Sequence, residues 1–302
     1  MKKTIPMSLI LGASAMIILA GCASSDSLSG DGAASSETIV VGSQDYYSNE
    51  IIAEIYAQAL ESDGYTVERD FRIGQREVYV SEIESGAVDL FPEYTGPILQ
   101  FWVPETTARL EGDVYDALVD AAPDSLTVLN QSAATDQDAY VVTREFAEAN
   151  GLTTIEDLAK VTTPLTLGGN SEGESRPNGP KGLKATYGVS VDFTPIEDGG
   201  GPLTLKALQD GDIQLAIIYT ADPAIEANDL VALKDTKGLF LASHVVPLAS
   251  DKIDERAASI INDISAKLTP AGLVGLNAQS ISDQSPADVI AKGWLEANPL
   301  AE

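Results

Sequence analysis

Residues 86–96 read Gly-Ala-Val-Asp-Leu-Phe-Pro-Glu-Tyr-Thr-Gly, and the rest of the chain is organised around this stretch. Its first glycine is a residue that often ends a helix, and the apolar run after it has the length of a buried parallel strand. Pro92 cannot donate a hydrogen bond to a sheet, so we expect the strand to end there. Ligands of open α/β sheets bind just outside the carboxyl ends of strands. Glu93, Tyr94 and Thr95 are therefore candidates for ligand contact, although an ordinary turn would have the same sequence.

Short apolar runs and helical patterns alternate on both sides of this stretch. Further strands are expected at residues 38–43, 65–71, 126–129, 139–143, 165–168, 193–196, 213–219, 230–234 and 240–248. Helices are expected between most of them and from residue 253 onward. Because the first elements follow one another as strand, helix, strand, helix, strand, the sheet that they form is expected to be parallel.

A second stretch repeats the pattern of the first. Residues 210–220 read Asp-Gly-Asp-Ile-Gln-Leu-Ala-Ile-Ile-Tyr-Thr, so a glycine turn is again followed by an apolar strand and a Tyr-Thr pair. The sequence contains no repeat of fixed period. The two Tyr-Thr strand ends therefore indicate two similar lobes that face one cleft.

The amino terminus reads as a targeting segment. A charged start is followed by an apolar run at residues 7–19 that is too short for a comfortable membrane span. Residues 19–22, Leu-Ala-Gly-Cys, resemble a bacterial lipobox, so we expect residues 1–21 to be a lipoprotein signal peptide and Cys22 to carry lipid. A cleaved secretory signal that happens to contain a cysteine is the alternative. Residues 22–37, rich in Ser, Gly and Ala, are expected to form a flexible tether that leaves the domain lipid-anchored outside the cytoplasmic membrane.

Composition excludes several classes of function. The net charge of −28 repels nucleic acid and anionic lipid, so binding of either is not expected. His244 is the only histidine and Cys22 the only cysteine, which leaves little for a metal site or a Ser-His-Asp triad. Residues 179–182, Gly-Pro-Lys-Gly, lack the Ser or Thr that completes a phosphate-binding loop. We therefore expect no enzyme activity, no catalytic residue, no metal and no cofactor.

Taken together, the motifs resemble the substrate-binding proteins of osmoprotectant ABC importers, the ProX/OpuC-like family that captures glycine betaine, choline, carnitine and related quaternary amines. Each motif alone is weak, but their order and spacing over nearly the whole mature chain are specific. The matching pieces are Val-Gly-Ser-Gln-Asp-Tyr at 41–46, the stretch 86–96, Ala-Tyr-Val-Val at 139–142, Arg176 with Asn178-Gly179, Gly-Asp at 211–212 with Tyr-Thr at 219–220, and Leu-Lys-Asp at 233–235 with Pro247.

The resemblance implies an α/β fold of the periplasmic-binding-protein type II. Two hinge-linked lobes would each hold a mainly parallel central sheet flanked by helices and would close on a ligand. With crossovers near Asp138 and Ser243, lobe one is residues 38–137 plus 244–302, and lobe two is residues 138–243. The resemblance also implies that a monomer passes its small-molecule ligand to an ABC permease subunit in the membrane.

The resemblance further implies which residues bind the ligand. Tyr94, Tyr140 and Tyr219 match three positions of the family's aromatic cage, and Arg176 matches its carboxylate clamp. A quaternary ammonium has no N–H to donate, so aromatic faces attract it, while the planar fork of an arginine suits a carboxylate. Packing at a strand end is the alternative for each tyrosine, and a surface ion pair is the alternative for Arg176.

Some positions depart from the family pattern. Gln44 stands where the family often has a lysine, Pro97 replaces a hydroxyl residue, and Ser243 falls near the fourth aromatic of the cage. Candidates for the missing aromatic face are Tyr46, Tyr47 and Trp102. The expected ligand-binding residues are therefore Gln44, Tyr46, Tyr94, Thr95, Tyr140, Arg176, Tyr219 and Ser243. A larger or less anionic quaternary amine fits as well as glycine betaine, and another zwitterion, such as ergothioneine or an amino acid, is the alternative ligand.

Overall fold

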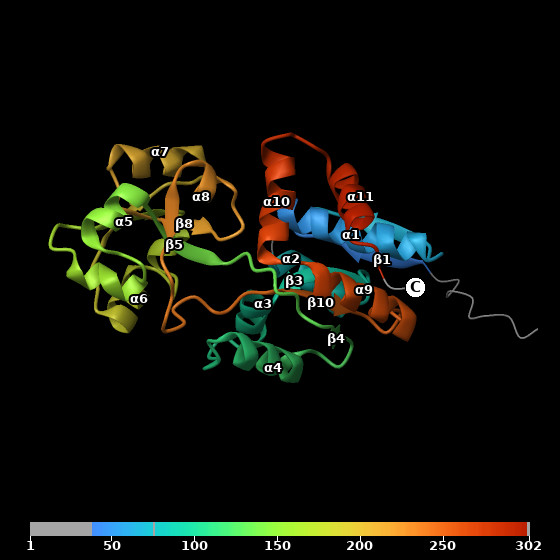
Figure 1. Ribbon diagram of the computed structural model, residues 1–302. Coiled ribbons are helices and arrows are strands. Elements are labelled where there is room, and N and C mark those ends of the chain that lie inside the picture. Colours follow the sequence, from blue (N-terminus) through green and yellow to red (C-terminus); the bar gives the residue numbers. More distant parts are fainter. Residues whose placement is uncertain (1–37, 75, 301–302) are drawn as a thin grey trace, which may run out of the picture. The chain divides into compact units, whose positions relative to one another are not determined.

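The computed structural model describes residues 38–74 and 76–300 of the 302-residue chain (Figure 1). The expected signal peptide, tether and lipidated Cys22 lie outside the described residues. Within the described part, the strands form two five-stranded sheets.

The first sheet has the strand order β2-β1-β3-β10-β4. Its strands are β1 (Ile39–Gly42), β2 (Val67–Asp70), β3 (Leu90–Tyr94), β4 (Thr127–Val128) and β10 (Val245–Ala249). The helices between or after them are α1 (Tyr47–Ser62), α2 (Arg76–Glu84), α3 (Thr95–Trp102), α4 (Glu111–Ala121), α9 (Glu255–Lys267), α10 (Pro270–Ile281) and α11 (Ala287–Ala297). Helix α1 packs against α11, and α3 packs against α4 (Figure 1).

The second sheet has the strand order β7-β6-β8-β5-β9. Its strands are β5 (Asp138–Thr143), β6 (Thr166–Gly169), β7 (Asp192–Pro195), β8 (Leu215–Tyr219) and β9 (Leu230–Ala232). The accompanying helices are α5 (Arg144–Asn150), α6 (Pro180–Tyr187), α7 (Pro202–Asp210), α8 (Ala224–Ala227) and the 3₁₀ turns η1 (Ile155–Lys160) and η2 (Ser171–Glu174).

The chain passes from one sheet to the other between β4 and β5 and again between β9 and β10. Asp138 begins β5, and Ser243 lies just before β10, so the predicted crossovers fall at these passages; the lobe boundaries themselves stay a prediction. The expected predominance of parallel pairing does not hold. In each sheet two strand pairs are parallel and two are antiparallel. The antiparallel pairs all involve β10 or β5, the strands through which the chain enters a sheet from the other one.

Both faces of each sheet are buried. Along β10, Val245 and Ala249 belong to one hydrophobic cluster, whereas Val246 and Leu248 belong to another. Along β5, Tyr140 and Val142 pack on one side and Ala139 and Val141 on the other. Because successive side chains of a strand point to opposite faces, this division follows directly from the period of two. Continuous apolar runs are what such doubly covered strands require.

Strand β3 continues through Pro92, contrary to the prediction that it ends there. The register places Pro92 opposite Pro247 of the antiparallel neighbour β10. A non-hydrogen-bonded pair needs no N–H from either residue, so two prolines can face each other in this position. The Pro92 carbonyl accepts a hydrogen bond from Asn49 Nδ2, and the Pro247 carbonyl accepts one from the Leu129 N–H. The strand expected at 240–248 begins only at Val245.

Candidate functional site

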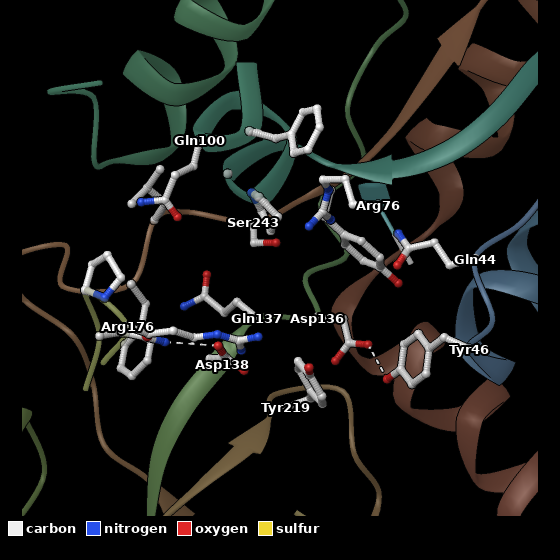
Figure 2. Close-up of a pocket in the computed structure, with 18 of the residues that line it drawn as sticks. Gln44, Tyr46, Arg76, Gln100, Asp136, Gln137, Asp138, Arg176, Tyr219 and Ser243 are labelled. Atoms are coloured by element: carbon white, nitrogen blue, oxygen red, sulfur yellow. Dashed lines mark hydrogen bonds between the residues drawn. The ribbon is translucent and has the colours of Figure 1, made fainter. Parts of the chain in front are cut away.

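A cavity of about 540 Å³ is lined by residues from strand ends, helices and loops that belong to both sheets (Figure 2). Strands β1 and β3 are parallel, so their carboxyl ends share one edge of the first sheet, and antiparallel β10 begins at this edge with Val245 opposite Tyr94. Helix α2 follows β2, which is also parallel to β1, so its first residue Arg76 reaches the same edge. We call Gln44, Arg76, Tyr94 and Ser243 the first-sheet wall.

A buried ion pair supports the first-sheet wall. The Glu93 side chain is fully buried, and its Oε1 accepts hydrogen bonds from Arg76 Nε at 2.7 Å and from the Tyr79 hydroxyl at 2.5 Å. Arg76 Nη2 lies 3.3 Å from Glu93 Oε2, which also accepts from the Tyr94 N–H. A buried carboxylate persists only when such partners satisfy it. Glu93 therefore orders the wall and does not face the cavity.

Three polar atoms of this wall are buried without a hydrogen-bond partner among the described residues. They are Gln44 Nε2, the Tyr94 hydroxyl and Ser243 Oγ. Buried polar atoms in folded proteins are nearly always hydrogen-bonded, so these three indicate a place that a polar group of a ligand would satisfy. Burial raises the pKa of the Tyr94 hydroxyl well above the usual value, so the hydroxyl remains neutral.

The opposite side of the cavity is formed by residues around the second sheet. The antiparallel register of β5 and β8 places Asp138 directly opposite Tyr219. Asn178 Nδ2 donates to Asp138 Oδ2 at 3.0 Å, and Arg176 precedes it on the loop between β6 and α6. We call Asp138, Arg176, Asn178 and Tyr219 the second-sheet wall.

Carboxylates make this second side negative. Burial raises the pKa of Asp138, and the nearby Arg176 charge opposes that rise. The Asp138 charge, together with burial, raises the pKa of Tyr219 to about 12, so its ring carries a neutral hydroxyl. The residue is 38% exposed and lines the cavity, which leaves it accessible from there.

Asp136 links the two sides. Its Oδ2 accepts a hydrogen bond from the Tyr46 hydroxyl at 2.7 Å, and its Oδ1 accepts one from the Ala221 N–H at 3.1 Å (Figure 2). Burial raises its pKa to about 6 despite these bonds. The Tyr46 and Tyr219 rings lie with centroids 6.0 Å apart and planes inclined by 44°. Aromatic faces and carboxylates thus occur together at this end of the cavity, a combination that attracts cations.

Six of the eight ligand-binding residues expected from the sequence line the cavity: Gln44, Tyr46, Tyr94, Arg176, Tyr219 and Ser243. Tyr140 and Thr95 do not. Tyr140 is fully buried on the core face of β5, where its hydroxyl donates to the Asn178 carbonyl at 2.6 Å. Thr95 Oγ1 donates to the Ala242 carbonyl at 3.1 Å and accepts from the His244 N–H at 3.0 Å. Both residues hold cavity-lining segments from behind.

Of the three candidates for the fourth aromatic residue of the cage, only Tyr46 lines the cavity. Tyr46 lines the cavity, and Tyr47 packs edge-on against it with ring centroids 5.0 Å apart. Trp102 does not line the cavity; its Nε1 donates to Glu84 Oε1. Two aromatic residues that the sequence reasoning missed, Phe101 and Phe240, are part of the lining.

Arg76 was also missed. Its place in the sequence could have identified it. Arg76 comes after the second strand of the parallel arrangement, and residues that follow such strands lie at the ligand-binding edge of the sheet. Within the described residues, no group of His, Cys, Asp and Glu could hold a metal ion. None of the helices in that same part of the chain is long and apolar enough to cross a membrane.

Comparison with known proteins places this geometry in context. A family model described as the substrate binding domain of ABC-type glycine betaine transport systems matches residues 37–297. The carnitine transport binding protein OpuCC of Listeria monocytogenes is 25% identical over 310 residues, covering 100% of this chain and 98% of the relative. The glycine betaine-binding protein YehZ of Escherichia coli K12 is 24% identical over 273 residues, covering 85% of this chain and 90% of the relative.

A solved structure shares the architecture. The crystal structure of a glycine betaine/carnitine/choline ABC transporter protein matches with a TM-score of 0.78 and 22% identity, covering 86% of this chain and 98% of that chain. The two-lobed periplasmic-binding fold expected from the sequence is thereby confirmed, with mixed instead of mainly parallel sheets.

Proposed function

The chain belongs to the family of substrate-binding domains of ABC-type glycine betaine transport systems, and from this premise we propose that it captures a quaternary-ammonium compatible solute. Glycine betaine, carnitine and choline are the candidate ligands. As the solute-binding component of an importer, the protein performs no chemistry of its own. It would release its ligand to the permease subunit of that importer.

The observation that carries the ligand proposal is the meeting of Tyr46 and Tyr219 with Asp136 and Asp138 at one end of the cavity. A quaternary ammonium has no N–H and cannot donate a hydrogen bond. Its binding site must therefore attract the positive charge by electrostatic interactions that do not depend on hydrogen bonds. Aromatic faces supply that attraction through their quadrupoles, and carboxylates add to it through their charge. Tyrosine rings whose hydroxyls remain neutral suit this task.

A substrate-binding protein of an ABC importer works outside the cytoplasmic membrane. We infer that residues 1–21 direct its export and that lipid on Cys22 anchors it there, with residues 22–37 as the tether. The lipobox-like sequence supports this inference. Labelling with a lipid precursor, lost in a Cys22→Ala variant that is still exported, would establish the anchor. We further propose that the domain acts as a monomer.

Isothermal titration calorimetry with glycine betaine, carnitine, choline and proline betaine tests the ligand proposal. At least one of them should bind, and Tyr219→Ala should weaken binding by about 2 kcal/mol, or roughly 30-fold, because a desolvated cation loses one aromatic face. Tyr219→Phe is the matched control, since it keeps the ring and loses only the hydroxyl. Absence of binding across the panel would overturn the proposal, as would equal losses in both variants.

A further inference from the structure

We propose that Arg76 on the first-sheet wall binds an anionic group of the ligand, together with Gln44 and Ser243. The inference rests on the proposed function and narrows it: the preferred quaternary amine would carry a carboxylate. The resemblance pointed instead to Arg176 as the carboxylate clamp and gave Arg76 no role.

One edge of the Arg76 guanidinium binds Glu93, and the other edge has no hydrogen-bond acceptor among the described residues. Its Nε and Nη2 face the Glu93 carboxylate, at 2.7 and 3.3 Å. Its Nη1 makes no hydrogen bond to any residue that the structure describes, and Arg76 lines the cavity. A guanidinium presents five N–H donors in a rigid fork, so a second carboxylate can bind the free end while the first holds the side.

Arg69 shows the same arrangement completed within this chain. Its Nε and Nη2 bind Glu54 at 2.8 and 3.1 Å, while Nη1 and Nη2 bind Glu61 at 2.7 and 2.8 Å. One guanidinium therefore holds two carboxylates at once, one along its side and one at its end. Arg76 differs in that its second carboxylate is missing from the described chain and its free end faces a cavity.

Two further donors stand on the same wall. Gln44 Nε2 and Ser243 Oγ are buried and without partners among the described residues, and both residues line the cavity with Arg76. Figure 2 shows the Arg76 side chain between those of Ser243 and Gln44. A carboxylate has two oxygens that accept several hydrogen bonds, so it would satisfy an amide N–H, a hydroxyl and a guanidinium together.

The charges on the other side of the cavity favour the same orientation. Asp136 and Asp138 lie with the Tyr46 and Tyr219 rings, so a quaternary ammonium is attracted there. Arg176 and Asp138 offset each other on this side, as Arg76 and Glu93 do on the first-sheet wall, so the Asp136 carboxylate and the two rings remain to attract the ammonium. A zwitterion would therefore bind with its ammonium toward the rings and its carboxylate toward Arg76. Choline has a hydroxyl instead of a carboxylate and would gain less from this wall.

The decisive variant is Arg76→Gln combined with Glu93→Gln, because removing Arg76 alone would leave the Glu93 charge buried and unpaired. Calorimetry with glycine betaine, carnitine and choline should show a loss of about 10–100-fold for the two carboxylate-bearing ligands, as expected for charge-assisted hydrogen bonds. The affinity for choline should change less than about threefold. Arg76→Lys keeps a cation beside Glu93 but loses the fork, so it should show an intermediate loss and serves if the double variant fails to fold.

A matched control removes a similar ion pair far from the cavity. Arg256 Nε and Nη2 bind the two oxygens of Asp63 at 2.5 and 2.6 Å. Asp63 follows the last residue of the 16-residue helix α1, about 24 Å from its cavity end. Arg256→Gln with Asp63→Asn should leave all affinities unchanged.

The outcomes separate the two proposals. Unchanged carboxylate binding in the Arg76 variants, or an equal loss for choline, would overturn the Arg76 assignment and leave the proposed function standing. Wild-type protein that binds choline but neither carboxylate-bearing ligand would do the same. Wild-type protein that binds nothing in the panel would overturn both.

Discussion

Arg76 and Arg176 line the same cavity, but the chain holds them in different ways. Arg76 begins α2, its side chain is 24% exposed, and the fully buried Glu93 fixes its orientation. Arg176 is exposed on the loop between β6 and α6. It interacts with Asp138 through the attraction between their charges. A group that is already held loses less conformational entropy when a ligand arrives. Arg76 is thus held before a ligand arrives, whereas Arg176 would lose more conformational entropy if it took part in binding.

The two walls also differ in what their acidic groups do. Glu93 is occupied by Arg76, Tyr79 and a backbone N–H, so its charge supports the wall from within. Asp136 and Asp138 line the cavity instead, so under the proposed function their charges would act on the ligand. An acidic residue on the first-sheet wall thus serves rigidity, whereas those across the cavity are open to it.

Replacing Glu93 by alanine should have the largest effect, because it leaves the Arg76 charge and the Tyr79 hydroxyl without their buried partner. We expect the free energy of unfolding in urea to fall by about 3–5 kcal/mol. The exposed pair of Arg144 and Asp229 provides the control, since Arg144→Ala should change stability little. Equal effects of the two substitutions would show that the first-sheet wall is not held by its buried pair.

Gly182→Ala should disturb the second-sheet wall instead. A Cβ at Gly182 would lie 1.6 Å from the Pro177 carbonyl oxygen, next to Arg176, so the loop would have to move. We expect the free energy of unfolding to fall by about 1–3 kcal/mol and ligand affinity to fall with it.

Gly293 in α11 is the matched control for Gly182, because nothing lies within 4 Å of its added Cβ. Gly293→Ala should stabilise the helix by roughly 0.5–1 kcal/mol and leave ligand affinity unchanged. If Gly182→Ala behaved like Gly293→Ala, the close packing of the loop would not be what positions Arg176.

The sequence predicted much of the secondary structure that supports the two walls of the cavity. The strand and helix order and the two Tyr-Thr strand ends follow from local patterns, because apolar period and turn residues are local properties. The other residues expected at the site, Gln44, Tyr46, Arg176 and Ser243 among them, came from the resemblance to the family. The pairing of Arg76 with Glu93 is not local. The pair joins the start of α2 to the end of β3, and no pattern of residue spacing along the chain predicts it.

Tyr140 and Pro92 show a second limit. The run Ala-Tyr-Val-Val-Thr at 139–143 is apolar on both faces, so its sequence does not say which face Tyr140 joins. Pro92 stays within β3 because its neighbour in the register is Pro247, 155 positions later in the chain, and only the folded sheet brings them together. Faces of doubly buried strands and cross-strand partners require the tertiary structure.

A further effect is expected from pH, because the acidic side of the cavity is titratable. Burial raises the pKa of Asp136 to about 6, and the charges of Asp222 and Asp138 contribute to the rise. If the ligand cation binds the ionised carboxylate, affinity should fall on acidification. With a pKa of about 6, only about a tenth of Asp136 is ionised at pH 5, so affinity should be about tenfold lower there than at pH 7.5.

Stability of the unliganded protein should move in the opposite direction. A carboxyl whose pKa is raised in the folded state binds more protons folded than unfolded, so its contribution to stability decreases as pH rises from about 4 to about 6. Calorimetry between pH 5 and 7.5 would measure the affinity, and urea titrations between pH 4 and 7.5 would measure the stability. Asp136→Asn should flatten them while leaving the Tyr46 hydroxyl an acceptor. Affinity that falls equally steeply in this variant would assign the titration to Asp138 and place the ligand's cation along the second-sheet wall.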